Sequence, residues 1–564
     1  MVWDGAASAR SFSSRASARN RPANGDPYDG HTLGPVIADL EMLTGVAVGR
    51  IHGDKGYRGH NYPDRFKVWI SGQVRRVALW DCLAERFWSG GYAVLSLEDL
   101  TSDAREYFPS SRTFAGVYAA LSMSIAIAHT FLAPPFQSPD EENHYLRAVQ
   151  LAQGSVVGRP TPDRSNAGAL LPSGAITLVE SFRYLAGKPT VRLDRPALSQ
   201  ARSVEWDWKH QQFAGFGNTV IYPPFLYTPA VIGIWIASSI SPLALDGLYA
   251  ARLSNVLAAT LISSLAVLIC PLAARSYIAS VLLLPMALAL FGSCAPDGFG
   301  IALVAIVIAI WARSGASGVG PPLRILGAAI LAVVASTKLP YLPILGIALL
   351  RWPQDRVRWG VVGAAGLVTS IPLGLAVWLA LASKVEFRPD LGVASSAQLR
   401  LVLNHPFDFV MVMARTGYMY GRVYVEQMIG VLGWLDNPLP RIAYPLYAAG
   451  LTVGAAGLLG CSLRRDGRWL ERLFIICILL CTLLALLLTL YLNWTPVGAP
   501  LVDGIQGRYF LVPILFLALL LGPLEYPASI LAHFSFWIVQ AVVLLVGASG
   551  LWFVPFAILT RYYG

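Results

Sequence analysis

Long apolar segments recur from residue 114 almost to the end of the chain, and polar stretches of very different length separate them. A helix of about 20 apolar residues crosses a hydrocarbon core of ~30 Å. The pattern therefore predicts an all-α polytopic membrane protein with about eleven transmembrane segments. They lie near residues 114–133, 221–240, 249–272, 277–293, 299–312, 325–350, 359–382, 442–462, 472–492, 508–524 and 529–558.

Basic residues predict how these segments are oriented. Three connecting loops, at 313–324, 351–358 and 463–472, are rich in arginine. Because cytoplasmic loops carry an excess of Lys and Arg, we expect these loops and the N-terminus in the cytoplasm. The first span then runs outward, which makes 134–220 a large first outer loop and 383–440 a second one.

Two interruptions indicate that not every apolar segment crosses the membrane as one straight helix. Strict alternation gives the wrong parity between 221 and 312, so at least one segment there is expected to be a half-helix. In "STKLPYLP", Lys338, Pro340 and Pro343 fall in the middle of an apolar run. Proline breaks helices, and such breaks at membrane depth occur where protein or water covers the freed backbone groups. The pattern predicts a cavity at Lys338.

Composition agrees with a membrane protein and narrows its chemistry. Of the residues, 55% are hydrophobic and only 13% charged, and the mean hydropathy is +0.55. The net charge of +10 is assigned to cytoplasmic loops, so no nucleic-acid partner is predicted. Five of the six cysteines lie in or beside apolar segments, which implies neither a disulfide framework nor a metal cluster.

The first 113 residues are polar and form a separate region. Residues 1–30 are rich in Ser, Arg, Ala and Gly and are expected to be disordered. Residues 31–77, with "DKGYRG" at Asp54, resemble part of the catalytic domain of DDE insertion-sequence transposases, but the resemblance stops abruptly. That chemistry needs three carboxylates on two metal ions. We interpret 31–77 as an inactive transposase-like remnant and 78–113 as a linker.

Charged residues concentrate directly after the first predicted span, in "SPDEENHYLRAVQLAQG". Pro139 and the acids that follow it are typical of a helix start, so a solvated first turn explains part of the pattern. Ionisable residues also stand at the ends or breaks of other apolar segments, where they are costly and therefore indicate function. The candidate site residues are Asp140, Glu141, His144, Arg147, Asp297, Lys338 and Arg508.

Seven stretches of the membrane region resemble a known family, in family order. They are "SPDEENHYLRAVQLAQG", "YPPFLYTPAVIG", "AARLSNVL", "CAPDGFG", "STKLPYLPIL", "GVLGWLDNPLP" and "GIQGRYFLVP". Residues 114–560 are similar to the bacterial membrane proteins of domain of unknown function 2142, which is itself related to the GT-C glycosyltransferases, such as the protein mannosyltransferases. The resemblance implies a GT-C-like fold in the bacterial inner membrane.

The resemblance also implies an activity, transfer of a sugar from a polyprenyl-phosphate donor to a cell-envelope glycan, lipid or protein at the outer membrane face. Asp140 or Glu141 matches the acid that acts as general base in GT-C enzymes. Arg508, Lys338 and Arg147 are the cations expected to meet the donor phosphate, Arg508 above all because a guanidinium binds phosphate through two hydrogen bonds. His144 and Asp297 are assigned to substrate binding or orientation. No metal ligand is assigned, although a divalent metal ion fits the same chemistry.

Two other classes of function stay open on the sequence. Broken helices also occur in transporters, so a lipid-linked glycan flippase or exporter is one alternative. A non-catalytic envelope-assembly subunit is the other, because a fold does not establish an activity. The acids at 140–142 favour the enzyme.

Overall fold

The computed structural model describes residues 111–313, 319–350, 359–383, 391–462, 469–520 and 530–564, and a few residues between 38 and 70. The chain divides into two compact units, Met1–Tyr107 and Phe108–Gly564. The predictions for residues 1–30 and for most of the linker fall outside the described residues.

The described part of the first unit is a pair of short parallel strands. Strand β1, Arg50–Gly53, pairs with β2, Lys67–Ile70, so that Arg50 lies opposite Lys67. Most of the transposase-like segment, including Asp54, lies outside the described residues, and that assignment stays a prediction.

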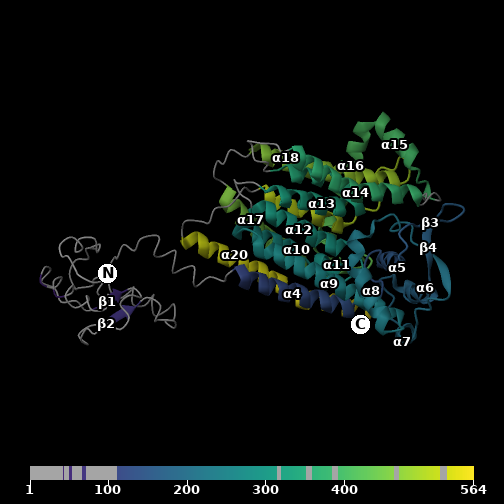
Figure 1. The fold of residues 1–564 in the computed structure, drawn as a ribbon, viewed down its shortest axis with the longest axis horizontal. Coiled ribbons are helices and arrows are strands. Elements are labelled where there is room, and N and C mark those ends of the chain that lie inside the picture. The colour runs from purple at the N-terminus through teal and green to yellow at the C-terminus, as the bar shows by residue number, and fades with distance from the viewer. Residues whose placement is uncertain are drawn as a thin grey trace. The chain divides into compact units, whose positions relative to one another are not determined.

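The second unit is built from helices that lie roughly side by side (Figure 1). Its apolar segments form the helices that the hydrophobic pattern predicts, because a helix satisfies its own backbone polar groups in lipid. The helices are α4 (Ser111–Leu132), α8 (Thr228–Ile240), α9 (Ala244–Ile269), α10 (Leu272–Leu282), α11 (Pro285–Phe291), α12 (Asp297–Arg313), α13 (Pro321–Thr337), η6 (Leu339–Leu349), α14 (Trp359–Ala382), α17 (Ala443–Ser462), α18 (Trp469–Asn493), η8 (Gly507–Phe510), α19 (Leu511–Leu515), η9 (Phe516–Leu519), α20 (Ile530–Ala548) and α21 (Gly550–Tyr562).

The predicted number of eleven membrane-crossing segments is not confirmed. Among the described residues, five helices are long and apolar enough to cross, and the bent pair Ala274–Leu282 and Pro285–Phe291, with an angle of 67°, raises the number to six. Further apolar helices are shorter, with 10–17 residues, and they are Pro224–Ile240, Pro321–Thr337, Leu339–Leu349 and Gly507–Leu519. A count of apolar runs does not separate a full crossing from such pieces, because both are equally apolar.

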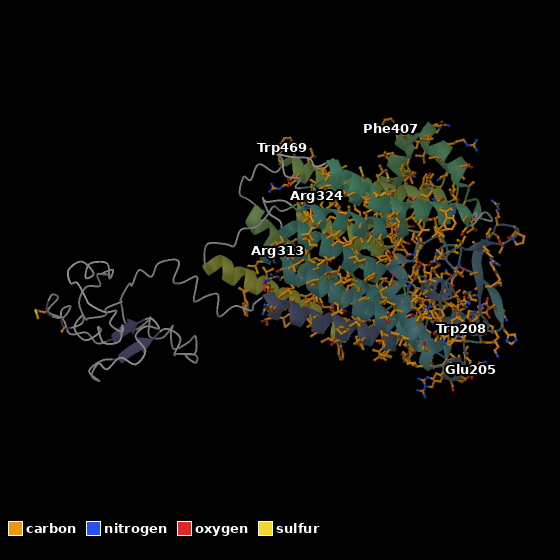
Figure 2. The ribbon with its side chains drawn as sticks, in the orientation of Figure 1. Glu205, Trp208, Arg313, Arg324, Phe407 and Trp469 are labelled. Atoms are coloured by element: carbon orange, nitrogen blue, oxygen red, sulfur yellow. The ribbon has the colours of Figure 1, made fainter. Side chains whose placement is uncertain are left out.

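The two ends of the helical unit differ. Figure 2 shows Arg313 and Arg324 at one end, and Glu205 and Trp208 of the first outer loop at the opposite end. Helix α12 ends at Arg313, so its first residue, Asp297, faces the end that carries the first outer loop.

Helix α8 explains why strictly alternating crossings do not fit the sequence between residues 221 and 312. Just after it ends, the carbonyl of Pro242 accepts a hydrogen bond of 2.8 Å from the backbone amide of Trp206, in the first outer loop. Helix α9 starts beside that point, at Ala244, and its last residue, Ile269, accepts a hydrogen bond of 3.2 Å from Arg313 at the other end. The 13-residue α8 therefore stays on the side of the first outer loop, as the predicted half-helix should.

The predicted break at Lys338 is confirmed. Helix α13 ends at Thr337, and the 3₁₀ segment η6 begins at Leu339. The buried guanidinium of Arg324, near the start of α13, donates a hydrogen bond of 2.9 Å to the carbonyl of Leu350, just after η6. The chain therefore turns at Lys338 and returns to the end where it started.

The first outer loop is a small folded layer. Its antiparallel sheet has the order β3-β4-β5, in which β4 pairs Gly168 with Gly215 of β5. Its elements are α5 (Glu141–Ala152), β3 (Arg159–Pro160), β4 (Ala167–Pro172), α6 (Ser173–Glu180), η3 (Arg183–Leu185), α7 (Arg195–Ala201) and β5 (Gln211–Gly215), and the 3₁₀ turn η4 (Pro224–Tyr227) follows it before α8. Its apolar side chains belong to the same buried cluster as those of the helices, so the loop is fixed to the membrane unit.

The second outer loop contains two helices and a hairpin. The helices α15, Ser395–Asn404, and α16, Pro406–Gly430, are separated at His405, because Pro406 cannot donate to the preceding turn. After α16, Val431–Leu432 (β6) pairs antiparallel with Asn437–Pro438 (β7).

Candidate functional site

The predicted helix start after Pro139 is present, with an unusual first residue. Helix α5 begins at Glu141, and Asp140 before it adopts a left-handed conformation with φ 61°. An aspartate at this position normally accepts hydrogen bonds from the first amides of its helix. The Asp140 side chain makes no such bond, and so its carboxylate is directed to another partner.

That partner is Arg508. Together with Asp140, Asp297 and Lys338 it forms a cluster of four predicted site residues. Its guanidinium binds the carboxylate of Asp140 and lies 3.5 Å from the carboxylate of Asp297. Asp297 also accepts a hydrogen bond of 2.5 Å from the ammonium group of Lys338. The residues come from the first outer loop, the start of α12, the break after α13 and η8, and their two positive and two negative charges balance.

A pocket lies at this cluster. Its empty volume, including the open mouth, is about 340 Å³. Asp297, Lys338 and Arg508 form its polar part. The remaining lining is mostly apolar and comes from Leu226, Gly300, Ile301, Val334, Thr337, Tyr341 and Val512. The cavity predicted at Lys338 is therefore present, and its wall combines charged groups with apolar surface.

Tyr509 supports the two cations of the cluster. The ammonium of Lys338 lies 4.7 Å from the centre of the Tyr509 ring, and the guanidinium carbon of Arg508 lies 5.5 Å from it. Cations are attracted to the face of an aromatic ring, most strongly where water is excluded. The ring therefore helps to hold both cations next to Asp297.

Glu141 is in a different environment from Asp140, its neighbour in sequence. Its side chain is completely buried, and both its oxygens accept hydrogen bonds from Arg252 of α9, at 2.8 and 2.6 Å. The backbone amide of Cys294 donates a further hydrogen bond of 2.8 Å. A carboxylate with three donors and no contact with solvent is suited to joining α5 to the helices, and it has no open side for a substrate.

His144 contacts two tyrosines. Its Nδ1 lies 2.7 Å from the hydroxyl of Tyr227, and its ring stacks on that of Tyr222 with 6.2 Å between the ring centres. Burial lowers the pKa of His144 from 6.5 to about 4, against the raising effect of Asp297 and Asp140. The imidazole is therefore neutral at pH 7 and acts as a hydrogen-bonding group.

Arg147 is also buried, and both terminal nitrogens of its guanidinium are engaged. It donates hydrogen bonds to Gln150 at 2.5 Å and to the carbonyls of Val156 and Tyr222 at 2.8 and 2.7 Å. Burial lowers the pKa of Arg147 to about 10. These contacts join α5 to the loop that follows it, and none of them belongs to the pocket.

Arg252 is the residue of this region that the sequence analysis missed. It lies in "AARLSNVL", a stretch used only as a family signature, yet an arginine within an apolar helix is itself a signal for a buried partner.

Within the described residues, no group of three or more His, Cys, Asp or Glu side chains gathers in a way that could hold a metal ion.

The fold and the site define a class, a polytopic helical membrane protein with a charged pocket beside the folded segment 134–220. Residues 123–518 match the family described as predicted membrane protein (DUF2142), and the chain belongs to that family. A search of curated proteins and a search of solved structures each found no match.

Proposed function

We propose that this protein is a membrane glycosyltransferase that moves a sugar from a polyprenyl-phosphate donor to an envelope acceptor. The observation that carries the proposal is the pocket lined by Asp297, Lys338 and Arg508 on its polar side and by apolar residues elsewhere. A lipid-linked sugar phosphate has the same two parts, an anion and a hydrocarbon chain.

The two cations suit the leaving phosphate. When the bond between the anomeric carbon and the phosphate oxygen breaks, negative charge develops on that oxygen, and fixed positive groups stabilise it. Arg508 has only 3% of its side chain exposed and Lys338 has 19%, so both act where water is largely excluded. The guanidinium of Arg508 offers two parallel donors, and Lys338 adds a point charge.

Asp140 is the general base in this proposal. Its side chain is 29% exposed, so an acceptor hydroxyl can reach it. As the acceptor oxygen attacks the anomeric carbon, Asp140 takes the hydroxyl proton, and the polyprenyl phosphate leaves with the electron pair of the broken bond. General base catalysis of this kind contributes roughly 10²- to 10⁴-fold to the rate.

The pairing of Asp140 with Arg508 implies that the donor binds before Asp140 takes the proton. In the structure Arg508 is shared between Asp140 and Asp297. A donor phosphate competes with Asp140 for the guanidinium, and the carboxylate that it displaces is free to accept the proton of the acceptor hydroxyl. The acid therefore becomes active only when the donor is bound, which would limit loss of the donor to water.

The remaining predicted residues take narrower roles. Asp297 holds Lys338 and Arg508 at the pocket, and His144 orients the surrounding hydrogen bonds. Glu141 and Arg147 are left out of the chemistry, because their polar groups are buried and engaged elsewhere.

The proposal includes an orientation in the bacterial inner membrane. The end with Arg313 and Arg324 faces the cytoplasm, as basic ends do, and the first outer loop faces outward. The acceptor is an envelope glycan, lipid or protein on that side.

The test is a profile of glycans and lipid carriers in a deletion strain that carries wild type, Asp140→Asn or Arg508→Lys, with protein levels checked by blot. Loss of one sugar, with accumulation of the undecorated acceptor and no rescue by well-expressed Asp140→Asn, supports the transferase. Full rescue by that variant removes Asp140 as the base and favours a flippase, an exporter or a non-catalytic subunit.

A further inference from the structure

The segment Ala133–Asp140, between α4 and α5, has an unusual backbone. Two of its residues, Phe136 with φ 63° and Asp140 with φ 61°, are in the left-handed region although neither is glycine. Such conformations are unfavourable for residues other than glycine and persist only where the surroundings hold them. Residues 133–139 are buried, so their carbonyl groups need protein partners.

Three side chains from distant parts of the chain supply those partners. Arg252 donates to the carbonyls of Ala133 and Pro134, at 3.0 and 3.1 Å. Arg508 donates to Pro139 at 3.0 Å. Between them, the indole Nε1 of Trp434 donates to the carbonyl of Phe136 at 2.9 Å.

Trp434 is itself fixed by a chain of contacts. It lies in the hairpin between β6 and β7, and its backbone amide donates to Oδ1 of Asp436 at 3.0 Å. The other oxygen of Asp436 accepts a hydrogen bond of 2.8 Å from Arg561 of α21. Arg561 also donates to the first outer loop, at Lys188 and Val191, at 2.7 and 2.6 Å.

We infer that Trp434 is a positioning residue that holds the strained segment Ala133–Asp140, and with it the carboxylate of Asp140, in place. Asp436 and Arg561 keep its indole oriented. The catalytic consequence for Asp140 rests on the proposed function. That Trp434 fixes the segment Ala133–Asp140 does not depend on it.

The test compares a variant in the hairpin with a variant beside it. Trp434→Phe keeps an aromatic ring and removes the donor to Phe136. Tyr444→Phe is the matched control, because the Tyr444 hydroxyl, in α17, donates to Gly430 and accepts from Leu439, at 3.2 and 3.1 Å, the residues that flank the hairpin. Amide hydrogen exchange of the full chain in detergent is measured for the peptide 134–142, together with the melting temperature.

We expect Trp434→Phe to raise exchange at the amides of Gln137 and Glu141 about fivefold to tenfold, in line with the loss of one hydrogen bond. These amides bond to Pro134 and Ser138 within the segment, at 3.2 and 3.1 Å. Tyr444→Phe should leave both unchanged. In membranes, Trp434→Phe should lower kcat for transfer and leave KM for the donor unchanged, because Trp434 does not line the pocket.

Wild-type exchange in Trp434→Phe, or an equal increase in Tyr444→Phe, would overturn the inference. If Trp434→Phe does not yield folded protein, Asp436→Asn takes its place, since it removes the charge that faces Arg561. No change in peptide 134–142 in that variant also overturns it. Should Asp140→Asn retain full transfer, the proposed function fails, and the exchange result still decides the role of Trp434.

Discussion

The guanidinium of Arg508 binds the carboxylate of Asp140 across 368 positions of the sequence. The arginine is buried and the aspartate is partly exposed, with 3% and 29% of their side chains accessible. The cation is therefore held inside the fold, while the acid reaches the surface of the site. This asymmetry is the basis for assigning phosphate binding to one residue and proton transfer to the other.

Arg508→Lys should lower transfer by at least tenfold. One lysine ammonium keeps the charge but does not reproduce the planar donors that reach Asp140, Pro139 and Asp297 together. The loss is expected mainly in KM for the donor, measured with membranes and purified lipid-linked sugar. Arg422→Lys is the control, because Arg422 is exposed and pairs with Glu426 of its own helix. Transfer equal to wild type in Arg508→Lys would contradict phosphate recognition by the guanidinium.

Glu141→Gln should destabilise the protein much more than Asp140→Asn does. Glu141 is buried against Arg252, and removing one partner of a buried ion pair costs about 3–5 kcal/mol. Melting temperatures in detergent should therefore fall clearly for Glu141→Gln and little for Asp140→Asn. Equal melting temperatures would argue against a structural role for the Glu141–Arg252 pair.

Acid should destabilise the protein partly through His144. The unfolded chain binds a proton on this histidine at a pKa of 6.5, but burial lowers the pKa in the folded state to about 4. The stabilising contribution is fully present above pH ~6.5 and falls as the pH drops towards 4, by up to about 1.4 kcal/mol per pH unit. We expect His144→Gln to flatten the dependence of the melting temperature on pH in this window. His210→Gln, at a histidine with 80% of its side chain exposed, should follow the wild-type curve.

Gly507→Ala should displace Arg508 and lower both stability and transfer. A β-carbon at Gly507 would lie 2.3 Å from the backbone nitrogen of Met428 and from the backbone oxygen of Tyr424. Backbone atoms cannot move aside easily, so overpacking of about 1–3 kcal/mol is expected. Gly417→Ala provides the control, since nothing lies within 4 Å of a β-carbon there. Melting temperature and rescue of the deletion strain measure the difference, and similar behaviour of the two variants would disprove tight packing at Gly507.

The hydrophobic pattern predicted where most helices lie, because a run of apolar residues in lipid must form a helix. It also located the break at Lys338, because prolines follow that residue closely. Its eleven crossings are not confirmed, because the described residues contain five candidate crossings, or six with the bent pair of α10 and α11. Hydropathy alone does not show whether an apolar helix turns back.

The sequence by itself determined that this is a helical membrane protein and that acids and cations stand at the ends of its apolar segments. Only the tertiary structure decided which of them meet. Asp140 and Glu141 are adjacent in sequence, but one faces Arg508 at the site and the other is buried against Arg252. The physical reason is that a charge in a poorly solvated environment must find an opposite charge or hydrogen-bond donors. Those partners come from helices far apart in sequence, and packing alone brings them together.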